Sequence, residues 1–511
     1  MTLACRNTQE VLHNGSKAVL RTCINNTINP PYQSARNPEE EPVIPDTTVF
    51  DQDNASLPPA HAERLPTVAE CAIHLELLET LFHLRQQILQ SGDIDKTMGT
   101  TPNRQTKTGY NGDTKTFKDD TLESRRQTKW PRFIEFAVVR FLDWRARLAK
   151  EGDKGDAFTL PPLDVIMVWH TFLLNPLLFN KHCRTEKLYK FPLPWQAIHK
   201  CINNGDWSFA LQAEAGANSL SLFELFSTWD SYLADQRSDV KSKLRLASIG
   251  TELFDTTQTD SASATRTSNF PSILSSLTSS STRTKKPQLI TREDLGTLPA
   301  TNPVRAHVEM FLSVDVNLAR ELKAAVLRQN SFIDKMHSHL WIRSPSLQDT
   351  LARSLSRYSQ FLLLMRRNRG KMMVPTLDID LAWHTHQCAA SRYVQETKKR
   401  VGRFVNHDDS IGKGDLDTGS GETRRLWRVQ FGGEYHICGC WDCEMLTSEI
   451  EKEFKYRGGA YDEDETYQID MQAVAERVDN KLRFYRAVEA ARRKGHALPV
   501  MPRSQKPERV L

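Results

Sequence analysis

The chain has 511 residues, a formal net charge of +5 and a mean hydropathy of −0.52. With 39% apolar residues, this length allows about three domains and at least one large hydrophobic core. No run of about 18 apolar residues is present, so we expect no membrane-spanning helix and no membrane partner. Because 68 basic residues nearly balance 63 acidic ones, the overall charge does not indicate nucleic-acid binding.

The beginning of the chain is predicted to be a disordered arm. Residues 1–66 are rich in Asn, Pro, Thr and Glu and show little periodicity, so we expect order to begin near Thr67. The first residues lack the apolar core of a secretory signal, while their mildly basic character leaves a mitochondrial presequence as an alternative. We therefore expect a cytoplasmic protein, with the nucleus as a second option.

Apolar residues at helical spacing predict a mainly α fold. The predicted helices cover 70–89, 130–149, 318–341, 347–368 and about 470–494. The segment 91–128 contains few large apolar side chains and is predicted to be an insert loop. The best candidate for a strand is 427–437.

Composition also predicts the domain boundaries. Residues 256–284 contain 17 Ser or Thr in 29 positions, which is typical of a linker. The predicted order is the arm 1–66, a first lobe 67–240, a linker 241–300, a second lobe 301–445 with a cysteine cluster, and a C-terminal helix and basic tail 446–511.

The most informative feature is an internal repeat. PPLDVIMVWHTFLLNPLLF at 161–179 matches PTLDIDLAWHTHQCAASRY at 375–393, with a constant offset of 214 positions. The shared core is Leu-Asp-x-x-x-x-Trp-His-Thr, and its central residues are Asp164, Trp169 and His170 in one copy and Asp378, Trp383 and His384 in the other. Each Asp is expected in the first turn of a helix, where its carboxylate meets free backbone N–H groups. The repeat predicts two helical lobes built on a duplicated unit.

The second copy carries additional chemistry. Asp380 lies four residues before His384, so both side chains share one helix face, and the carboxylate could orient a metal-binding or proton-transferring imidazole. The first copy has Ile166 at the equivalent position. The other interpretation of each histidine is a buried structural residue.

A metal-dependent enzyme is the alternative that these residues support. His384 and His386 with Asp380 or Asp408 could form a two-histidine, one-carboxylate Fe²⁺ site. Histidines at positions i and i+2 of one helix point away from each other, so this geometry requires the helix to end at Thr385. Otherwise Asp408 and its neighbours are interpreted as a turn with capping aspartates.

The strongest chemical signal is a cysteine cluster. The chain has nine cysteines, and an odd number argues against a closed disulfide framework. The residues Cys438, Cys440, Cys443 and His436 supply the ligand types of a structural Zn²⁺ site. A distant ligand could come from His384, His386 or His407. Buried free thiols and redox chemistry remain alternatives.

Several segments resemble the glycine-rich domain-containing protein family of plants and fungi, a domain of unknown function. The segments that carry the resemblance are 161–176, 327–341, 370–387 (GKMMVPTLDIDLAWHTHQ), 401–409 (VGRFVNHDD) and 438–444 (CGCWDCE), the last three being similar to the fungal members. It covers about 67–235 and 300–445. The chain departs from the family pattern at Cys388 and Ala390 and shows no long glycine-rich tail. The resemblance implies no particular reaction.

We expect a non-enzymatic helical protein that serves as a scaffold or binds a protein partner, with a candidate structural zinc site. No P-loop, dinucleotide-binding, zinc-protease or hydrolase nucleophile motif is present to support another class. The metal-dependent enzyme is the first alternative. Nucleic-acid binding is the second, because 283–373 contains 16 Lys or Arg against 7 Asp or Glu.

Overall fold

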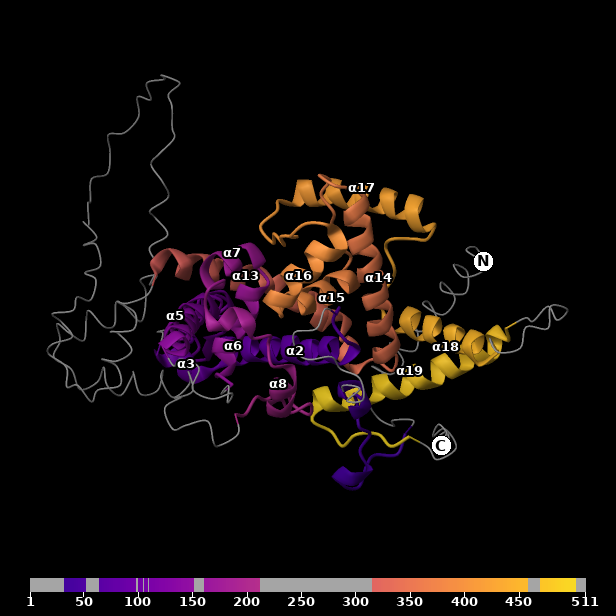
Figure 1. The fold of residues 1–511 in the computed structure, drawn as a ribbon. Coiled ribbons are helices and arrows are strands. Elements are labelled where there is room, and N and C mark those ends of the chain that lie inside the picture. The colour runs from indigo at the N-terminus through magenta and orange to yellow at the C-terminus, as the bar shows by residue number, and fades with distance from the viewer. Residues whose placement is uncertain are drawn as a thin grey trace, which may run out of the picture. The chain divides into compact units, whose positions relative to one another are not determined.

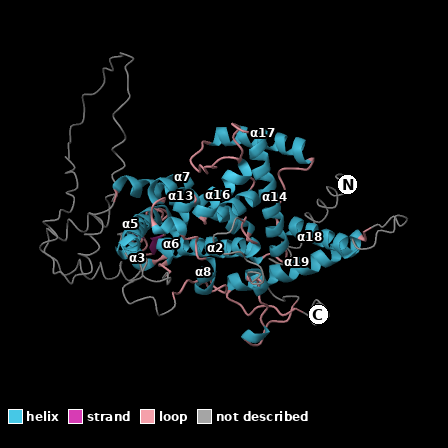
Figure 2. Cartoon of the chain, viewed as in Figure 1, coloured by secondary structure: helices cyan, strands magenta, loops and turns pink. Residues whose placement is uncertain are grey.

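The computed structural model describes residues 32–51, 64–97, 100–103, 105–108, 110–150, 160–211, 315–457 and 469–501. These residues form a mainly helical structure, as predicted (Figures 1 and 2). The predicted linker, 241–300, lies outside the described residues, as do the last ten residues of the predicted basic tail.

The elements follow one another along the chain with a single short hairpin among the described residues. The α-helices are α2 (Val68–Gln90), α3 (Gly92–Thr97), α4 (Leu122–Arg126), α5 (Lys129–Lys150), α6 (Leu163–Leu173), α7 (Pro176–Cys183), α8 (Trp195–Cys201), α13 (Val316–His339), α14 (Leu347–Arg367), α15 (Leu377–Gln387), α16 (Ala390–Val401), α17 (Lys413–Phe431), α18 (Trp441–Arg457) and α19 (Met471–Lys494). The 3₁₀ turns are η1 (Pro38–Glu40), η2 (Thr47–Phe50), η3 (Lys187–Lys190) and η4 (Trp341–Arg343), and the strands are β1 (Gln105–Thr108) and β2 (Thr114–Phe117).

The long predicted helices are confirmed, and their ends follow the expected chemistry. The last helix, α19, begins after Asp470, whose carboxylate accepts hydrogen bonds at 3.0 Å from the backbone N–H groups of Gln472 and Ala473. It ends at Gly495, which has a φ of +63°, a conformation that glycine adopts without steric cost. Helices α18 and α19 lie side by side (Figure 1).

Contacts divide the chain into two units, each assembled from separate stretches of sequence. Unit 1 comprises 1–83, 172–212 and 328–511, and unit 2 comprises 84–171 and 213–327. The two lobes predicted from the sequence, by contrast, are each continuous.

The segment predicted as an insert loop, 91–128, instead contains helices α3 and α4 and an antiparallel β1–β2 hairpin. Strand β2 is exposed along its whole length, so it has no buried face to leave an apolar pattern in the sequence. Asp95 of this segment is buried and pairs with Lys129 at 2.7 Å and Arg126 at 2.5 Å. The prediction was wrong because these ion pairs, rather than large apolar side chains, fix the segment.

Part of the predicted disordered arm is also ordered. Residues 32–51 form η1 and η2, and Ile44 and Phe50 are buried. Ile44 packs with Phe484, Val488 and Leu498 in a small core that includes residues of α19. A few apolar side chains therefore suffice to order a polar segment when a helix is present for them to pack against.

The strand predicted at 427–437 is absent. Residues up to Phe431 belong to α17, and Gly432, with a φ of +71°, ends that helix. Trp427 is buried from within the helix, packed against Tyr435 at 5.0 Å. The aromatic residues that suggested a strand thus face the core from a helix and the turn after it.

The main core of unit 1 lies among α14, α15, α16 and α17. Its large buried side chains include Tyr358, Phe361, Trp383, Tyr393 and Trp427. The Trp383 indole donates a hydrogen bond to the Tyr393 hydroxyl at 2.8 Å, and that hydroxyl donates to the Val405 carbonyl at 2.9 Å. Because the Trp383 indole and the Tyr393 hydroxyl each have a hydrogen-bond partner, these two large amphipathic aromatics are accommodated in the core.

Both copies of the repeat form a helix, a sharp break and a second helix. The break occurs at Asn175 in one copy (φ −113°, ψ 71°) and at Ala389 in the other (φ −123°, ψ 73°), again 214 positions apart. Edge-to-face ring pairs span each break, Phe172 with Phe179 at 4.8 Å and His386 with Tyr393 at 5.1 Å. The two copies thus share a backbone conformation and a packing contact beyond their common motif.

The aspartate of each motif pairs with an arginine of the preceding long helix. Asp164 lies 3.4 Å from Arg140 of α5, and Asp378 lies 2.5 Å from Arg357 of α14. Neither ion pair was expected from the sequence, which suggested only that each aspartate meets the free backbone N–H groups at the start of its motif helix.

The tryptophan of each motif packs against an aromatic residue four positions beyond that arginine. Trp169 lies 5.4 Å from Trp144, and Trp383 lies 5.7 Å from Phe361, measured between ring centroids. Each motif helix therefore meets its preceding helix through one ion pair and one aromatic pair.

The membrane criterion gives a limited result. Among the described residues, no single helix has the length and apolarity to cross a bilayer. The pair α6 and α7, bent by 104°, meets the criterion only when its two helices are taken together.

Helix α2 begins with a capping box whose glutamate, Glu70, also pairs with two arginines. The Thr67 N–H donates to the Glu70 carboxylate at 2.9 Å, and the Glu70 N–H donates to the Thr67 hydroxyl at 3.1 Å. Arg64 and Arg392 lie 2.8 and 3.3 Å from the same buried carboxylate. Burial alone would raise the pKa of Glu70, but Arg392, Arg64 and Thr67 outweigh it and lower the pKa.

We expect Glu70→Gln to reduce the free energy of unfolding by about 3 kcal/mol at neutral pH, because it leaves two arginines without their carboxylate. A carboxyl with a lowered pKa in the folded state stabilises the protein above its unfolded pKa, and this contribution is lost as the pH falls through the folded value. The difference between wild type and variant should therefore shrink on acidification, as measured by urea unfolding at several pH values. Glu422→Gln, at an exposed ion pair, is the control, and a pH-independent difference would contradict the prediction.

A second prediction concerns the motif aspartate. Arg357 bonds Asp378, the Thr376 hydroxyl at 3.2 Å and the Tyr435 carbonyl at 2.6 Å, so Asp378→Asn and Arg357→Lys should each cost about 3 kcal/mol of unfolding free energy. Because the two residues act on one another, the double variant should cost clearly less than the sum. Chemical denaturation of all four proteins measures this coupling, and strict additivity would show that the ion pair is unimportant.

Candidate metal sites

The three clustered cysteines come together at the start of α18. Their Sγ atoms all lie within 4.8 Å of one another, and those of Cys438 and Cys440 are 3.3 Å apart. Cys443 is buried in the first turn of the helix, while Cys438 is exposed. The arrangement supplies three sulfur ligands from one turn of chain and one helix end.

The turn that carries the cysteines is anchored by two tryptophans. The Trp341 indole donates to the Gly439 carbonyl at 2.6 Å, and the Trp441 indole donates to the His339 carbonyl at 2.9 Å. A Cβ atom at Gly439 would lie 2.8 Å from the Trp341 ring, so this position requires glycine. The cysteine turn is thus held against η4 and the end of α13.

His436, predicted as a fourth ligand, does not join the sulfur atoms. Its Nε2 atom lies 3.4 Å from the Ser420 hydroxyl. Nor do His384, His386 or His407 meet the cysteines, because among the described residues the sulfur atoms form a group of their own. In the described structure, none of these histidines therefore belongs to the group that the three sulfur atoms form.

Contacts among the thiols favour the protonated forms of Cys440 and Cys443. Contact with the Cys438 thiol raises the pKa of Cys440 and of Cys443. A bound metal ion would reverse this effect by deprotonating its thiol ligands. The positive end of the α18 dipole would add to the stability of a Cys443 thiolate.

A second group of candidate ligands lies on α15 and in the segment after α16. Asp380, His384 and His407 place a carboxylate oxygen and two imidazole nitrogens within 4.8 Å of one another. The two Nε2 atoms are 3.1 Å apart, and the Asp380 Oδ1 atom lies 3.3 Å from that of His384 and 3.7 Å from that of His407. This is a two-histidine, one-carboxylate group, but its second histidine is His407 rather than His386.

The surroundings of this group are partly aromatic. The Phe332 ring lies 4.3 Å from the His384 ring, and the Trp383 ring lies 5.0 Å from the His407 ring. The His407 Nδ1–H group donates to the Leu174 carbonyl at 3.1 Å. The side chain of Asp380 is 21% exposed, against 2% for His384, so the group opens to solvent on the Asp380 side.

The protonation states fit ligand chemistry in part. Burial lowers the pKa of His384 to about 4, so its imidazole is neutral at physiological pH. Burial would lower the pKa of His407, but contact with the Asp380 carboxylate outweighs this effect and raises the pKa. The pKa of Asp380 is lowered by the two imidazoles against the effect of burial, which keeps its carboxylate ionised.

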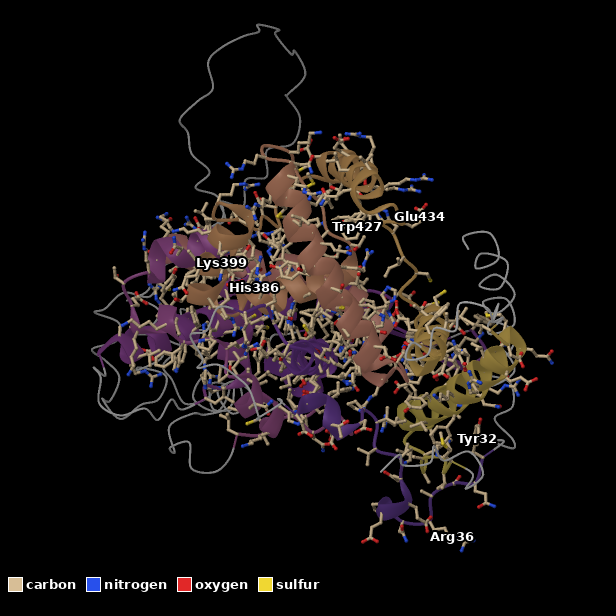
Figure 3. The ribbon with its side chains drawn as sticks, turned by 45° about the vertical axis from the view of Figure 1, so that its right-hand side comes forward. Tyr32, Arg36, His386, Lys399, Trp427 and Glu434 are labelled. Carbon is tan, nitrogen blue, oxygen red and sulfur yellow. The ribbon has the colours of Figure 1, made fainter. Side chains whose placement is uncertain are left out.

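His386 and Asp408, the other predicted ligands, have structural contacts elsewhere. His386 lies within the packed side chains (Figure 3), its Nδ1 atom 2.8 Å from the Tyr358 hydroxyl, and burial holds its pKa well below the usual value. Helix α15 continues past Thr385, so the two histidines point apart. Asp408 accepts hydrogen bonds from the Ser410 N–H and hydroxyl, as expected of a turn.

His407 is the residue that sequence reasoning assigned to the wrong neighbours. It was considered as a distant ligand for the cysteines and, with Asp408 and Asp409, as a capping turn or a metal-binding segment. More than 20 positions separate it from His384, so local spacing could not pair the two histidines. The available signal was the coincidence of a histidine beside two aspartates after a short helix.

The basic stretch 283–373 supplies many of its cations to internal contacts. Arg328 pairs with Asp409 at 2.8 Å, and Arg353 with Glu444 at 2.5 Å. Lys323 pairs with Glu135 at 2.7 Å. These cations stabilise the fold, which removes them from a surface for nucleic acid. Residues 283–314 lie outside the described residues.

Comparisons with known proteins agree with the resemblance found in the sequence. The family model for glycine-rich domain-containing protein-like sequences matches residues 279–396. Glycine-rich domain-containing protein 1 of Arabidopsis thaliana is 36% identical over 128 residues, which cover 23% of this chain and 15% of that relative. Glycine-rich domain-containing protein 2 of the same plant is 38% identical over 128 residues, or 23% of this chain and 16% of the relative.

No solved structure matches the chain. The chain matches only about a sixth of the length of each of these relatives. The segment matched by the family model contains the second copy of the repeat with Asp380 and His384, and it ends before His407 and the cysteines. Residues 279–396 of this chain are therefore similar to glycine-rich domain-containing protein-like sequences.

Proposed function

We propose that this chain is a helical protein that binds a protein partner and whose cysteine turn holds a structural Zn²⁺ ion. The observation that carries the proposal is the convergence of the Cys438, Cys440 and Cys443 sulfur atoms. Thiolates are preferred ligands of zinc, and such sites contribute directly to folding.

The spacing of the sulfur atoms suits a tetrahedral ion. Ligands at about 2.3 Å from zinc lie about 3.8 Å apart in a tetrahedron. The sulfur atoms of the cluster lie within 4.8 Å of one another, with the shortest separation at 3.3 Å, so small side-chain rotations would bring them to that geometry. A fourth ligand would come from His436 after reorientation, from water, or from a partner.

A binding role is favoured over catalysis by how the repeat motif is used. Asp164 and Asp378 pair with arginines, and Trp169 and Trp383 pack against aromatic rings. These residues serve helix packing in both copies. In this proposal the zinc ion fixes the turn at 438–443 against Trp341 and so gives the surface beside α18 a single conformation.

The zinc site predicts one equivalent of bound zinc in protein purified without chelator. Cys440→Ser and Cys443→Ser should each remove it, because three sulfur ligands from one turn act together. Elemental analysis with a thiol-reactive titration measures this loss. Cys201→Ala, at a buried cysteine outside the cluster, is the matched control and should retain zinc.

The same experiment identifies the fourth ligand and can reject the site. Zinc affinity lowered at least tenfold in His436→Ala would identify His436 as a ligand. Protein with no zinc and no affinity for added zinc would contradict the proposed site.

The partner-binding part has its own test. A protein that is crosslinked to the wild type and to Cys201→Ala but not to Cys440→Ser would support a binding surface formed by the zinc turn. Equal crosslinking to the wild type, Cys201→Ala and Cys440→Ser would show that the partner-binding surface does not depend on the zinc site.

A further inference from the structure

We infer that Asp380, His384 and His407 bind one divalent first-row transition-metal ion in a site that keeps coordination positions open for an exogenous ligand. This site is independent of the cysteine turn and of the binding role proposed above. Its ligands are two nitrogens and one oxygen, a set that suits Fe²⁺, Mn²⁺, Co²⁺ or Zn²⁺.

The separations between the ligand atoms already match a shared ion. Ligand atoms at about 2.1 Å from a metal and 90–109° apart lie about 3.0–3.4 Å from one another. The observed separations are 3.1 Å between the two imidazole nitrogens, and 3.3 and 3.7 Å from them to the carboxylate oxygen. An ion could therefore be bound with little movement of the backbone.

The hydrogen bond from His407 presents the correct nitrogen to the ion. A backbone carbonyl can only accept, so the Leu174 carbonyl fixes the hydrogen of His407 on Nδ1. In the neutral imidazole the lone pair then lies on Nε2, the atom that faces His384 and Asp380. Metal-binding histidines are commonly oriented in this way by a carbonyl behind the ring.

Two polar atoms of the group, Asp380 Oδ1 and His384 Nδ1, lack a hydrogen-bond partner within the described structure. The Asp380 Oδ1 atom is buried and makes no hydrogen bond within the described structure, although it lies between two imidazoles. A buried carboxylate oxygen without a partner is costly, and an ion bound at this point would satisfy it.

The other copy of the repeat shows why the carboxylate is unusual. The position equivalent to Asp380 is occupied by Ile166, which is fully buried. Packing of the repeat helix therefore requires only an apolar side chain here. The carboxylate in the second copy adds a ligand at the expense of that packing.

Access to the site is one-sided. Phe332 and Trp383 shield the two imidazoles, while Asp380 is the most exposed of the three ligands. Three protein ligands leave at least one position of a tetrahedral ion and three of an octahedral ion. These positions would be taken by water or by a small anionic oxygen or nitrogen ligand.

The test uses full-length protein in which Cys438, Cys440 and Cys443 are all changed to serine, so that the cysteine turn contributes no metal binding. Titration with Co²⁺ should show one equivalent bound, with visible absorption bands that lack the sulfur charge-transfer band. Adding azide should shift these bands, because an open position accepts the anion.

Two substitutions in that background locate the site. Asp380→Asn keeps the shape of the side chain, and His407→Gln removes an imidazole from a partly exposed position, so both should fold, as checked by circular dichroism. Each should weaken Co²⁺ binding at least about 100-fold. Asp408→Asn, at the neighbouring turn carboxylate, is the matched control and should bind Co²⁺ as the background does.

The outcomes are decisive in either direction. No Co²⁺ binding in the folded triple-serine background, or binding unchanged by Asp380→Asn and His407→Gln, would overturn the inference. Loss of thermal stability in these variants without metal binding in the background would likewise show that the group is only a buried ion pair. Bands that azide does not shift would overturn the open position.

Discussion

The position of Arg357 determines much of what surrounds both candidate metal sites. Its guanidinium pairs with Asp378 at the start of α15, donates to the Tyr435 carbonyl and lies 4.9 Å from the centre of the Trp427 ring. One side chain of α14 thereby fixes the helix that carries Asp380 and His384 and the segment that leads to Cys438. A rigid, delocalised arginine suits this position because it can donate in several directions at once. A lysine could make only part of these contacts.

The two copies of the repeat preserve this construction but differ in the chemistry added to it. Each has an arginine–aspartate pair, an aromatic residue against the motif tryptophan, and a break with nearly the same backbone dihedrals. Only the second copy replaces a buried isoleucine by Asp380. A fold that is already secured by the shared contacts can tolerate one costly polar residue, which is the usual condition for placing a reactive group in a core.

The parts that could be predicted from the sequence are those with a local physical cause. Helices α2, α5, α14 and α19 have apolar spacing that is visible in the sequence, and the helix-ending role of Gly495 follows from its lack of a side chain. The β1–β2 hairpin could not be predicted in the same way, because strand β2 buries no face that would impose an alternating pattern. The order of 32–51 depends on Phe484 and Leu498, which are more than 400 residues away.

The same distinction explains the candidate sites. The cysteines could be grouped from the sequence because six positions span all three, whereas His436 is close in sequence and yet bonds Ser420 instead. The pairing of His384 with His407 depends on how α16 returns the chain to α15, which no local pattern encodes. Local spacing thus pointed to the cysteines and histidines as candidates but could not show that His407, rather than His386, lies beside His384.

The two candidate sites differ in a way that would keep their metals apart. Sulfur ligands at an exposed helix end favour soft or borderline ions and enclose them, whereas two imidazoles and a carboxylate behind aromatic side chains accept harder ions and leave positions open. Zinc could enter either, but the three thiolates would hold it more tightly. Zinc would therefore occupy the cysteine turn first, and the identity of the ion at Asp380 would depend on which metal ions remain available. An ion bound there could exchange ligands without disturbing the fold, because Arg357 and the core around Trp383, rather than the metal, hold α15 in place.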